Sequence, residues 1–143
     1  MCYSIGFSRH GLSSLIGAIC LSMVNSASAA NAAIHVELNK AEQVDAACKT
    51  FLLIENRTAE DYRKIKLDLV VFNTDKIIEK RFALNVAPIA ANKTLVKNFN
   101  IADIACDDIS QILLNDVLDC EQNLEPCINV IDVSTKSSIR FFK

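Results

Sequence analysis

Short runs of alternating apolar and polar residues constrain the fold of this chain more than any other feature. The clearest run is Ile65–Phe72, in which every second residue from Ile65 to Val71 is Ile, Leu or Val. A period of two places these side chains on one face of a β-strand. No long segment after the N-terminal region carries the spacing of about 3.6 residues that marks an amphipathic helix. The pattern therefore predicts an all-β protein.

Eight such segments follow one another, separated by breaks that contain Asn and Asp. They predict an immunoglobulin-like β-sandwich of seven to eight short antiparallel strands. A short helical turn is expected near residues 102–108, because Ile101, Ile104 and Ala105 have helical spacing. The expected strands are Ile34–Leu38, Ala47–Glu55, Ile65–Phe72, Ile77–Leu84, Thr94–Phe99, 109–118, Ile128–Val133 and Ile139–Phe142.

Three segments carry a family resemblance: Thr50–Thr58, Ile65–Phe72 and Pro88–Phe99. An extended strand ends in an Asn-containing turn, and a later strand follows a Pro-containing loop. This order resembles small immunoglobulin-like domains of bacterial periplasmic proteins of uncharacterised function. The resemblance implies a fold and no activity. The Cys–Trp–Cys arrangement of antibody domains is not met, because the chain has no Trp.

Residues 1–29 have the composition of a cleavable signal peptide. Arg9 precedes the apolar stretch Leu12–Val24, and the small residues Ala27-Ser28-Ala29 follow. We expect cleavage before Ala30, which leaves residues 30–143 as one β-sandwich domain in the periplasm or outside the cell. The apolar stretch is shorter than the about 20 residues that span a bilayer, so no stable membrane span is expected after cleavage. A permanent anchor, or a lipid attached to Cys20, is the alternative.

Four cysteines follow residue 29: Cys48, Cys106, Cys120 and Cys127. In an exported chain they predict two disulfides. The short loop between Cys120 and Cys127 favours that pair and leaves Cys48 with Cys106, although the other two pairings stay open. A four-cysteine zinc site would need closely spaced cysteine pairs, which are missing here. No metal site is expected.

The lack of glycine after residue 29 excludes three glycine-dependent motifs. Phosphate-binding loops, dinucleotide fingerprints and the G-x-S-x-G elbow all need glycine. His35 is the one histidine in this region, and the sequence shows no partner that would orient it, so it is expected on a strand face without a catalytic role. We therefore expect no enzyme activity and no cofactor.

An acidic stretch is the one unusual feature of the composition. No Lys or Arg lies between Lys97 and Lys136, and eight Asp and Glu residues do. This charge argues against nucleic acid, which binds basic surfaces, and allows a cationic partner. The alternative function is a small Ca-dependent ligand-binding protein or hydrolase that uses residues 103–132. The possible acidic patch comprises Asp103, Asp107, Asp108, Asp116 and Asp119.

The expected function is a protein-interaction or structural module with a protein partner in the cell envelope. Open edges of a sandwich can accept a partner strand through backbone hydrogen bonds. Ile34–Leu38 and Ile139–Phe142 are the candidate edges, with Ile139, Phe141 and Phe142 as possible contact residues. Phe141 and Phe142 point to opposite faces of a strand, so at least one of them is expected to be exposed.

Two N-glycosylation acceptor patterns occur, Asn56-Arg-Thr58 and Asn92-Lys-Thr94. Both fall at expected turns, so both asparagines are expected to be accessible. Such a short pattern often arises by chance, and it would usually go unused in a bacterial host.

Overall fold

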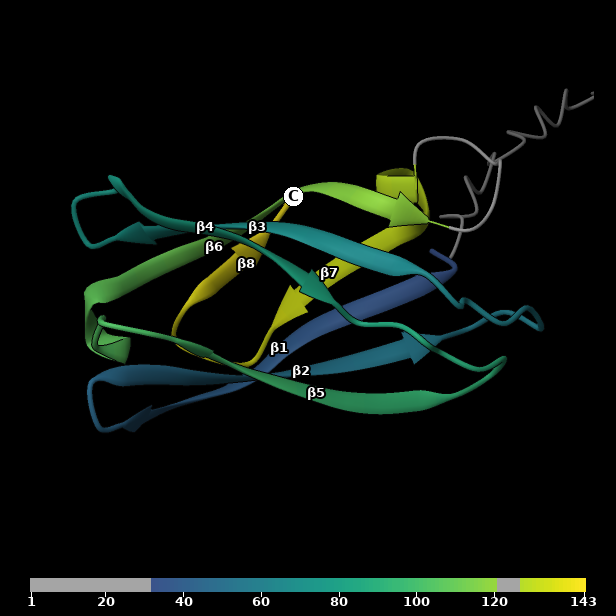
Figure 1. Cartoon of the computed structure of the whole chain (residues 1–143), viewed down its shortest axis with the longest axis horizontal. Helices are drawn as coiled ribbons and strands as arrows, with labels where there is room; N and C mark the ends of the chain where they lie inside the picture. Colours follow the sequence, from purple (N-terminus) through teal and green to yellow (C-terminus); the bar gives the residue numbers. More distant parts are fainter. Residues whose placement is uncertain (1–31, 121–126) are drawn as a thin grey trace, which may run out of the picture.

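Two four-stranded β-sheets pack face to face in the computed structural model, which describes residues 32–120 and 127–143 (Figure 1). One sheet has the order β5–β2–β1–β7 and the other β4–β3–β6–β8. The elements are β1 (Ile34–Val44), β2 (Ala47–Asn56), β3 (Ile65–Asn73), β4 (Ile78–Asn85), β5 (Thr94–Ile101), the short 3-10 helix η1 (Cys106–Asp108), β6 (Ile109–Cys120), the 3-10 helix η2 (Cys127–Val130), β7 (Ile131–Thr135) and β8 (Arg140–Phe142).

The all-β sandwich confirms the fold class expected from the sequence, with one correction to the strand directions. Both sheets are mixed, because β1 pairs with β7 and β6 pairs with β8 in parallel. Hairpins join neighbours such as β1 and β2 or β3 and β4 and make them antiparallel. β7 and β8 instead pair with strands that lie far away in the sequence, so no hairpin sets their direction.

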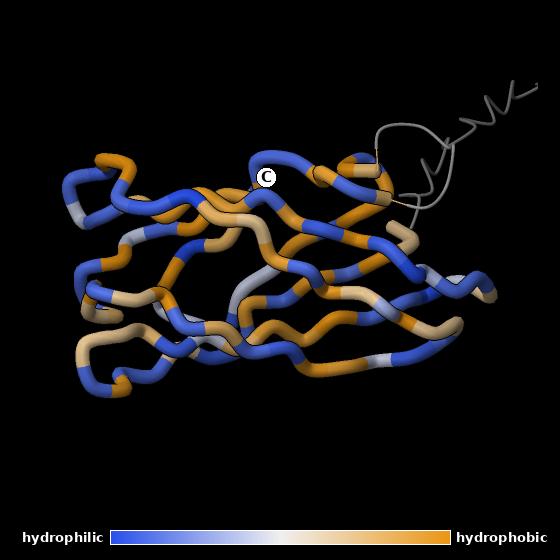
Figure 2. The backbone as a smooth tube through the Cα atoms, viewed as in Figure 1, coloured by the Kyte–Doolittle hydropathy of each residue, from blue (hydrophilic) through white to orange (hydrophobic). Residues whose placement is uncertain are grey.

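Apolar and polar residues alternate along the strands, so that the apolar side chains form a core between the sheets. Figure 2 shows this alternation as changes of colour along the backbone. Ile65, Leu67 and Leu69 are buried in β3, as the run in the sequence predicts. Burying one such side chain contributes about 1.5–3 kcal/mol. Phe82 of β4 and Phe99 of β5 meet with ring centroids 5.3 Å apart, which joins the two sheets along one side.

The helical turn expected near residues 102–108 is present as η1, and β6 begins at Ile109 as predicted. Two other expectations are wrong. Ile34–Leu38 lies in β1 between β2 and β7, so it is not a sheet edge. Ile128–Val133 is not one strand, because residues 127–130 form η2 and only the segment from Ile131 is extended.

Polar residues take the place of glycine where the backbone turns sharply. Asp45, Asn92 and Asp103 have φ values of 50°, 53° and 55°. Asn and Asp enter this left-handed region more readily than other non-glycine residues. In the β3–β4 hairpin, the side-chain oxygen of Asn73 accepts hydrogen bonds from the backbone N–H groups of Asp75 and Ile77. Asn73 thus forms the turn predicted from the sequence.

Two disulfides join the cysteines in the pairs that the sequence favours, Cys48 with Cys106 and Cys120 with Cys127. The first links residues separated by 58 positions and fixes η1 to the buried start of β2. A loop of this size contributes about 3–5 kcal/mol in the chain-entropy model.

One carboxylate, Asp68 of β3, is buried on the outer face of its sheet. The Arg81 guanidinium binds it with two hydrogen bonds of 2.9 and 2.7 Å, and the Asn115 amide donates a third of 2.7 Å. The hydrogen bonds from Arg81 lower the pKa of Asp68 below its ordinary value. This group ties together three strands of one sheet, β4, β3 and β6.

Residues 1–29, where the signal peptide is expected, lie outside the described part of the chain. That prediction therefore stays a prediction. Within residues 32–120 and 127–143, no helix is long and apolar enough to cross a membrane.

Candidate binding site at one end of the sandwich

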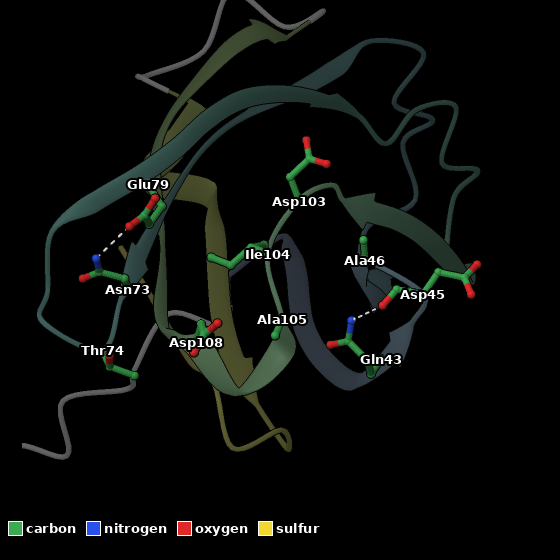
Figure 3. Close-up of a pocket in the computed structure, with 10 residues that line it drawn as sticks. All are labelled: Gln43, Asp45, Ala46, Asn73, Thr74, Glu79, Asp103, Ile104, Ala105 and Asp108. Carbon is green, nitrogen blue, oxygen red and sulfur yellow. Dashed lines mark hydrogen bonds between the residues drawn. The ribbon is translucent and has the colours of Figure 1, made fainter.

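A cleft of about 710 Å³ opens at the end of the sandwich where three connections meet (Figure 3). These are the β1–β2 turn, the β3–β4 hairpin and the connection from β5 to η1. We name it the loop-end cleft. Its lining residues are Gln43, Asp45, Ala46, Asn73, Thr74, Glu79, Asp103, Ile104, Ala105 and Asp108.

Four of the lining residues are acidic, and each connection contributes at least one of them. Asp45 comes from the first turn, Glu79 from the hairpin, and Asp103 and Asp108 from the segment around η1. The ammonium group of Lys80 lies 3.8 Å from an Asp103 carboxylate oxygen. Ionised carboxylates only accept hydrogen bonds. The loop-end cleft therefore presents acceptors and negative charge, a combination suited to cationic donors.

Hydrogen bonds hold the walls of the cleft in place. The Gln43 side-chain nitrogen donates to the Asp45 carbonyl at 2.7 Å, while its side-chain oxygen accepts from the Cys106 backbone N–H at 2.9 Å. Gln43 thereby connects the β1–β2 turn to η1, which the Cys48–Cys106 disulfide also fixes. Asn73 donates to the Glu79 carboxylate at 2.7 Å within the hairpin. Such prior ordering reduces the entropy lost on binding.

The two hairpins that line the cleft also carry exposed apolar side chains. Ile77 and Ile78 of the β3–β4 hairpin are 62% and 61% exposed, and Val44 of the neighbouring hairpin is also exposed. Isolated exposed apolar residues are common on protein surfaces. Two adjacent isoleucines at a hairpin beside an acidic cleft give a partner apolar surface to cover.

The predicted acidic patch is only partly assembled. Asp103 and Asp108 both line the loop-end cleft, and Asp107 belongs to η1 beside it. Asp116 is paired with the middle of β3, and Asp119 lines a different pocket at the far end of β6. Among the described residues, no group of three or more His, Cys, Asp or Glu side chains is arranged to hold a metal ion.

β8, which contains Phe141 and Phe142 and follows directly on Ile139, lies at the edge of its sheet. Ile139 and Phe141, however, are buried in the core. Phe142 is half-buried on the outer face, where the guanidinium carbon of Arg140 lies 4.6 Å from the centre of its ring. Of the three, Phe142 therefore has the side chain best placed to meet a partner.

Asn56 is buried, which contradicts the expectation that its glycosylation pattern is accessible. Its amide nitrogen donates to the carbonyls of Glu60 and Ala90 at 2.7 and 3.0 Å, and its oxygen accepts from the Thr58 N–H. The side chain is thus a structural link between two loops. Asn92 is exposed, as expected.

Sequence reasoning missed several residues of the cleft, including Gln43, Asp45 and Glu79. They lie near hairpin turns. The Asn and Asp residues of those turns were the only signal in the sequence that could have pointed to this region. It also missed the partners of His35, which contacts Ser134 and approaches Asp132 across two strands. The spacing of Asp132 and Ser134 puts both on one face of a strand, but only the pairing of β7 with β1 brings them to His35.

The fold and the cleft define a class: a small, disulfide-linked, two-sheet β-sandwich with an acidic cleft between its turns. No protein-family model matches the sequence, and the search of curated proteins found no match. Among solved structures, the fold is similar to that of IrmA from Escherichia coli, with a TM-score of 0.54 and 10% sequence identity. The match covers 70% of this chain and 89% of that one. At this identity, the likeness concerns the fold.

Proposed function

We propose that the protein is an exported, immunoglobulin-like interaction module whose loop-end cleft binds a basic segment of a partner protein in the cell envelope. The observation that carries this proposal is the cleft of about 710 Å³, which has four acidic residues in its lining and a disulfide that fixes η1 beside it. Connections at the end of a rigid sandwich are a common place for binding sites.

The two disulfides support export to the periplasm or beyond the cell, because such bonds persist in oxidising compartments. The composition of residues 1–29 supports the same route. A module in this position meets envelope proteins and secreted proteins as partners.

The chemistry of the cleft specifies the segment that it binds. Arginine is favoured, because its planar guanidinium can donate two parallel hydrogen bonds to a carboxylate such as Asp103 or Asp108. An apolar residue next to that arginine would cover Ile77 or Ile78, and burying the part of either side chain that is still exposed offers about 1–2 kcal/mol. Charge attraction would also speed the encounter at low salt.

A titration with a synthetic peptide of alternating Arg and Leu tests the proposal. We expect the affinity to fall with added salt. We also expect it to fall about tenfold in the double variant Asp103→Asn/Asp108→Asn, since two partly exposed ion pairs contribute about 1 kcal/mol or less each. Asp119→Asn at the opposite end is the matched control and should bind as the wild type does. Equal losses in the double variant and the control would contradict a role for the cleft.

Photo-cross-linking in intact cells tests the same site with the natural partner. A photoreactive residue at Thr74, which lines the cleft, should capture a partner through a segment rich in Arg or Lys. The same residue placed at Thr58, near the other end, should not capture that segment. Capture at Thr58 alone, or through an acidic segment, would contradict the proposal.

A further inference from the structure

A second group of reactive side chains lies away from the loop-end cleft, on the outer face of β1 and β7. The parallel pairing of these strands puts His35 directly opposite Asp132, and Ser134 lies two residues further along β7 on the same face. The Ser134 hydroxyl oxygen is 3.0 Å from Nε2 of His35. An Asp132 carboxylate oxygen is 3.6 Å from Nδ1 of the same ring.

The contacts of the His35 ring are compatible with the proton arrangement that general-base chemistry needs. The side chain is 16% exposed, and Nδ1 is buried without a hydrogen-bond partner in the described part of the chain. If Nε2 accepts the Ser134 hydroxyl proton, Nδ1 carries the ring proton and faces Asp132. The separation of 3.6 Å is longer than a hydrogen bond, but such contacts often shorten once substrate binds and the ring gains a proton.

Neighbouring residues on the same face place an ion pair beside this group. Glu37 is paired with Ser134 across the strands and accepts a hydrogen bond of 2.8 Å from the Asn39 amide. The Lys136 ammonium lies 3.5 Å from Glu37 and follows Ser134 by two residues. Hydrogen bonding from Asn39 lowers the pKa of Glu37, which favours the ionised carboxylate that pairs with Lys136.

We propose that Ser134, His35 and Asp132 form a nucleophilic acyl-transfer site that hydrolyses small activated esters. Ser134 is the nucleophile, His35 the general base and acid, and Asp132 a positioning residue for the imidazole. Lys136, two residues after Ser134, is the cation that would stabilise the developing oxyanion once its exposed side chain turns from Glu37 to the bound ester. This site is separate from the loop-end cleft and does not depend on the proposed function.

The reaction proceeds in two balanced steps. The Ser134 oxygen attacks the ester carbonyl, its proton passes to Nε2 of His35, and the bond to the leaving alcohol breaks as that alcohol takes the proton. The serine then carries the acyl group. Water attacks this new ester while His35 accepts the proton of the water and returns it to the Ser134 oxygen, which releases the carboxylic acid. No other reactant is consumed.

The position of the site indicates the class of substrate. β7 is an edge strand, so Ser134 lies at the border of an open sheet face. One flexible ammonium group stabilises an oxyanion less firmly than an array of fixed donors does. The site therefore suits small acyl esters with a good leaving group, such as aryl acetates, rather than peptides.

Hydrolysis of p-nitrophenyl acetate by the purified, disulfide-bonded protein tests the inference. We expect an acetyl group on Ser134 in peptide mapping and a rate about 100-fold higher than that of Ser134→Ala, in line with general-base catalysis. Ser138→Ala, which changes an exposed serine nearby, should keep the wild-type rate. An unchanged rate in Ser134→Ala, or acetyl groups confined to lysine side chains, would overturn the inference.

Variants of two further residues distinguish a loss of catalysis from a loss of folding. His35→Gln should abolish acetylation of Ser134 while the melting temperature stays within a few degrees of the wild type. Asp132→Asn should slow acetylation, and Asp132→Glu should restore part of the rate, because a carboxylate can again face Nδ1. If Asp132→Asn and Asp132→Glu react equally fast, Asp132 has no positioning role and the inference fails for that residue.

Discussion

Replacing Asp68 with Asn should destabilise the protein through the loss of one buried ionic group. The carboxylate accepts two hydrogen bonds from Arg81 and one from Asn115, all between 2.7 and 2.9 Å. An amide at this position would turn an N–H₂ group toward a donor of Arg81 or Asn115. Hydrogen bonds to charged groups contribute about 1.5–3 kcal/mol each. Much of the Arg81 side chain is exposed, so water can replace part of the lost hydrogen bonding in the variant. We therefore expect the free energy of unfolding to fall by about 2 kcal/mol.

The same substitution should change how stability depends on pH. Because the pKa of Asp68 is lowered in the folded protein, its ionised form stabilises the fold above the ordinary carboxyl pKa of about 3.9. That contribution disappears as the pH falls through the lower pKa of the folded state. The free energy of unfolding of the wild type should therefore fall more steeply on acidification below about pH 5 than that of Asp68→Asn.

Urea unfolding followed by circular dichroism, with both disulfides intact, measures both effects. At neutral pH the loss of about 2 kcal/mol corresponds to a decrease of about 8 °C in melting temperature. Asp119→Asn is the matched control and should stay within about 0.5 kcal/mol of the wild type. Equal stabilities of Asp68→Asn and the control, or parallel pH profiles of wild type and Asp68→Asn, would refute the reasoning.

Three further tests use the same unfolding assay, and the first also measures peptide binding. The double variant Cys48→Ala/Cys106→Ala should lower the free energy of unfolding by about 3–5 kcal/mol. It should also weaken peptide binding, because it releases η1 from β2. Unchanged stability together with unchanged peptide affinity would contradict the role of this disulfide. Asn56→Ala should cost about 1–3 kcal/mol because it removes the hydrogen bonds that this buried side chain makes to the Glu60 and Ala90 carbonyls and to the Thr58 N–H, whereas Asn98→Ala, at an exposed position of β5, should cost less than about 0.5 kcal/mol. Leu69→Ala should cost about 2–5 kcal/mol through a core cavity, and Ile77→Ala, at an exposed position, less than about 0.5 kcal/mol.

Local patterns were sufficient to predict most of the strands and the turn at Asn73, although they missed that residues 127–130 form a 3-10 helix. The alternation in Ile65–Phe72 depends only on which face of a strand is buried, so the core residues of β3 follow from it. Asn73 forms its turn through hydrogen bonds within four residues. The pairing of Cys120 with Cys127 followed from a short loop, and the remaining pair was then determined.

The sequence did not allow us to predict which strands pair over long distances in the chain. β7 and β1 lie at opposite ends of the described sequence, yet they pair side by side. This pairing makes Ile34–Leu38 part of an inner strand and brings Ser134 to His35. The loop-end cleft likewise requires three turns to meet. The sequence placed Asp103 and Asp119 in one acidic stretch, but β6 extends between them and carries them to opposite ends.

Binding of a basic peptide at the loop-end cleft is the central claim, and NMR chemical-shift mapping with the Arg-Leu peptide tests it most directly. The account predicts that the backbone amide signals of Ala46, Thr74 and Ala105, one on each wall of the cleft, shift together and saturably. Signals of Lys66 and Asn85, at the other end of the sandwich, should stay in place. Shifts confined to the far end, or no saturable shift at any position, would contradict the account.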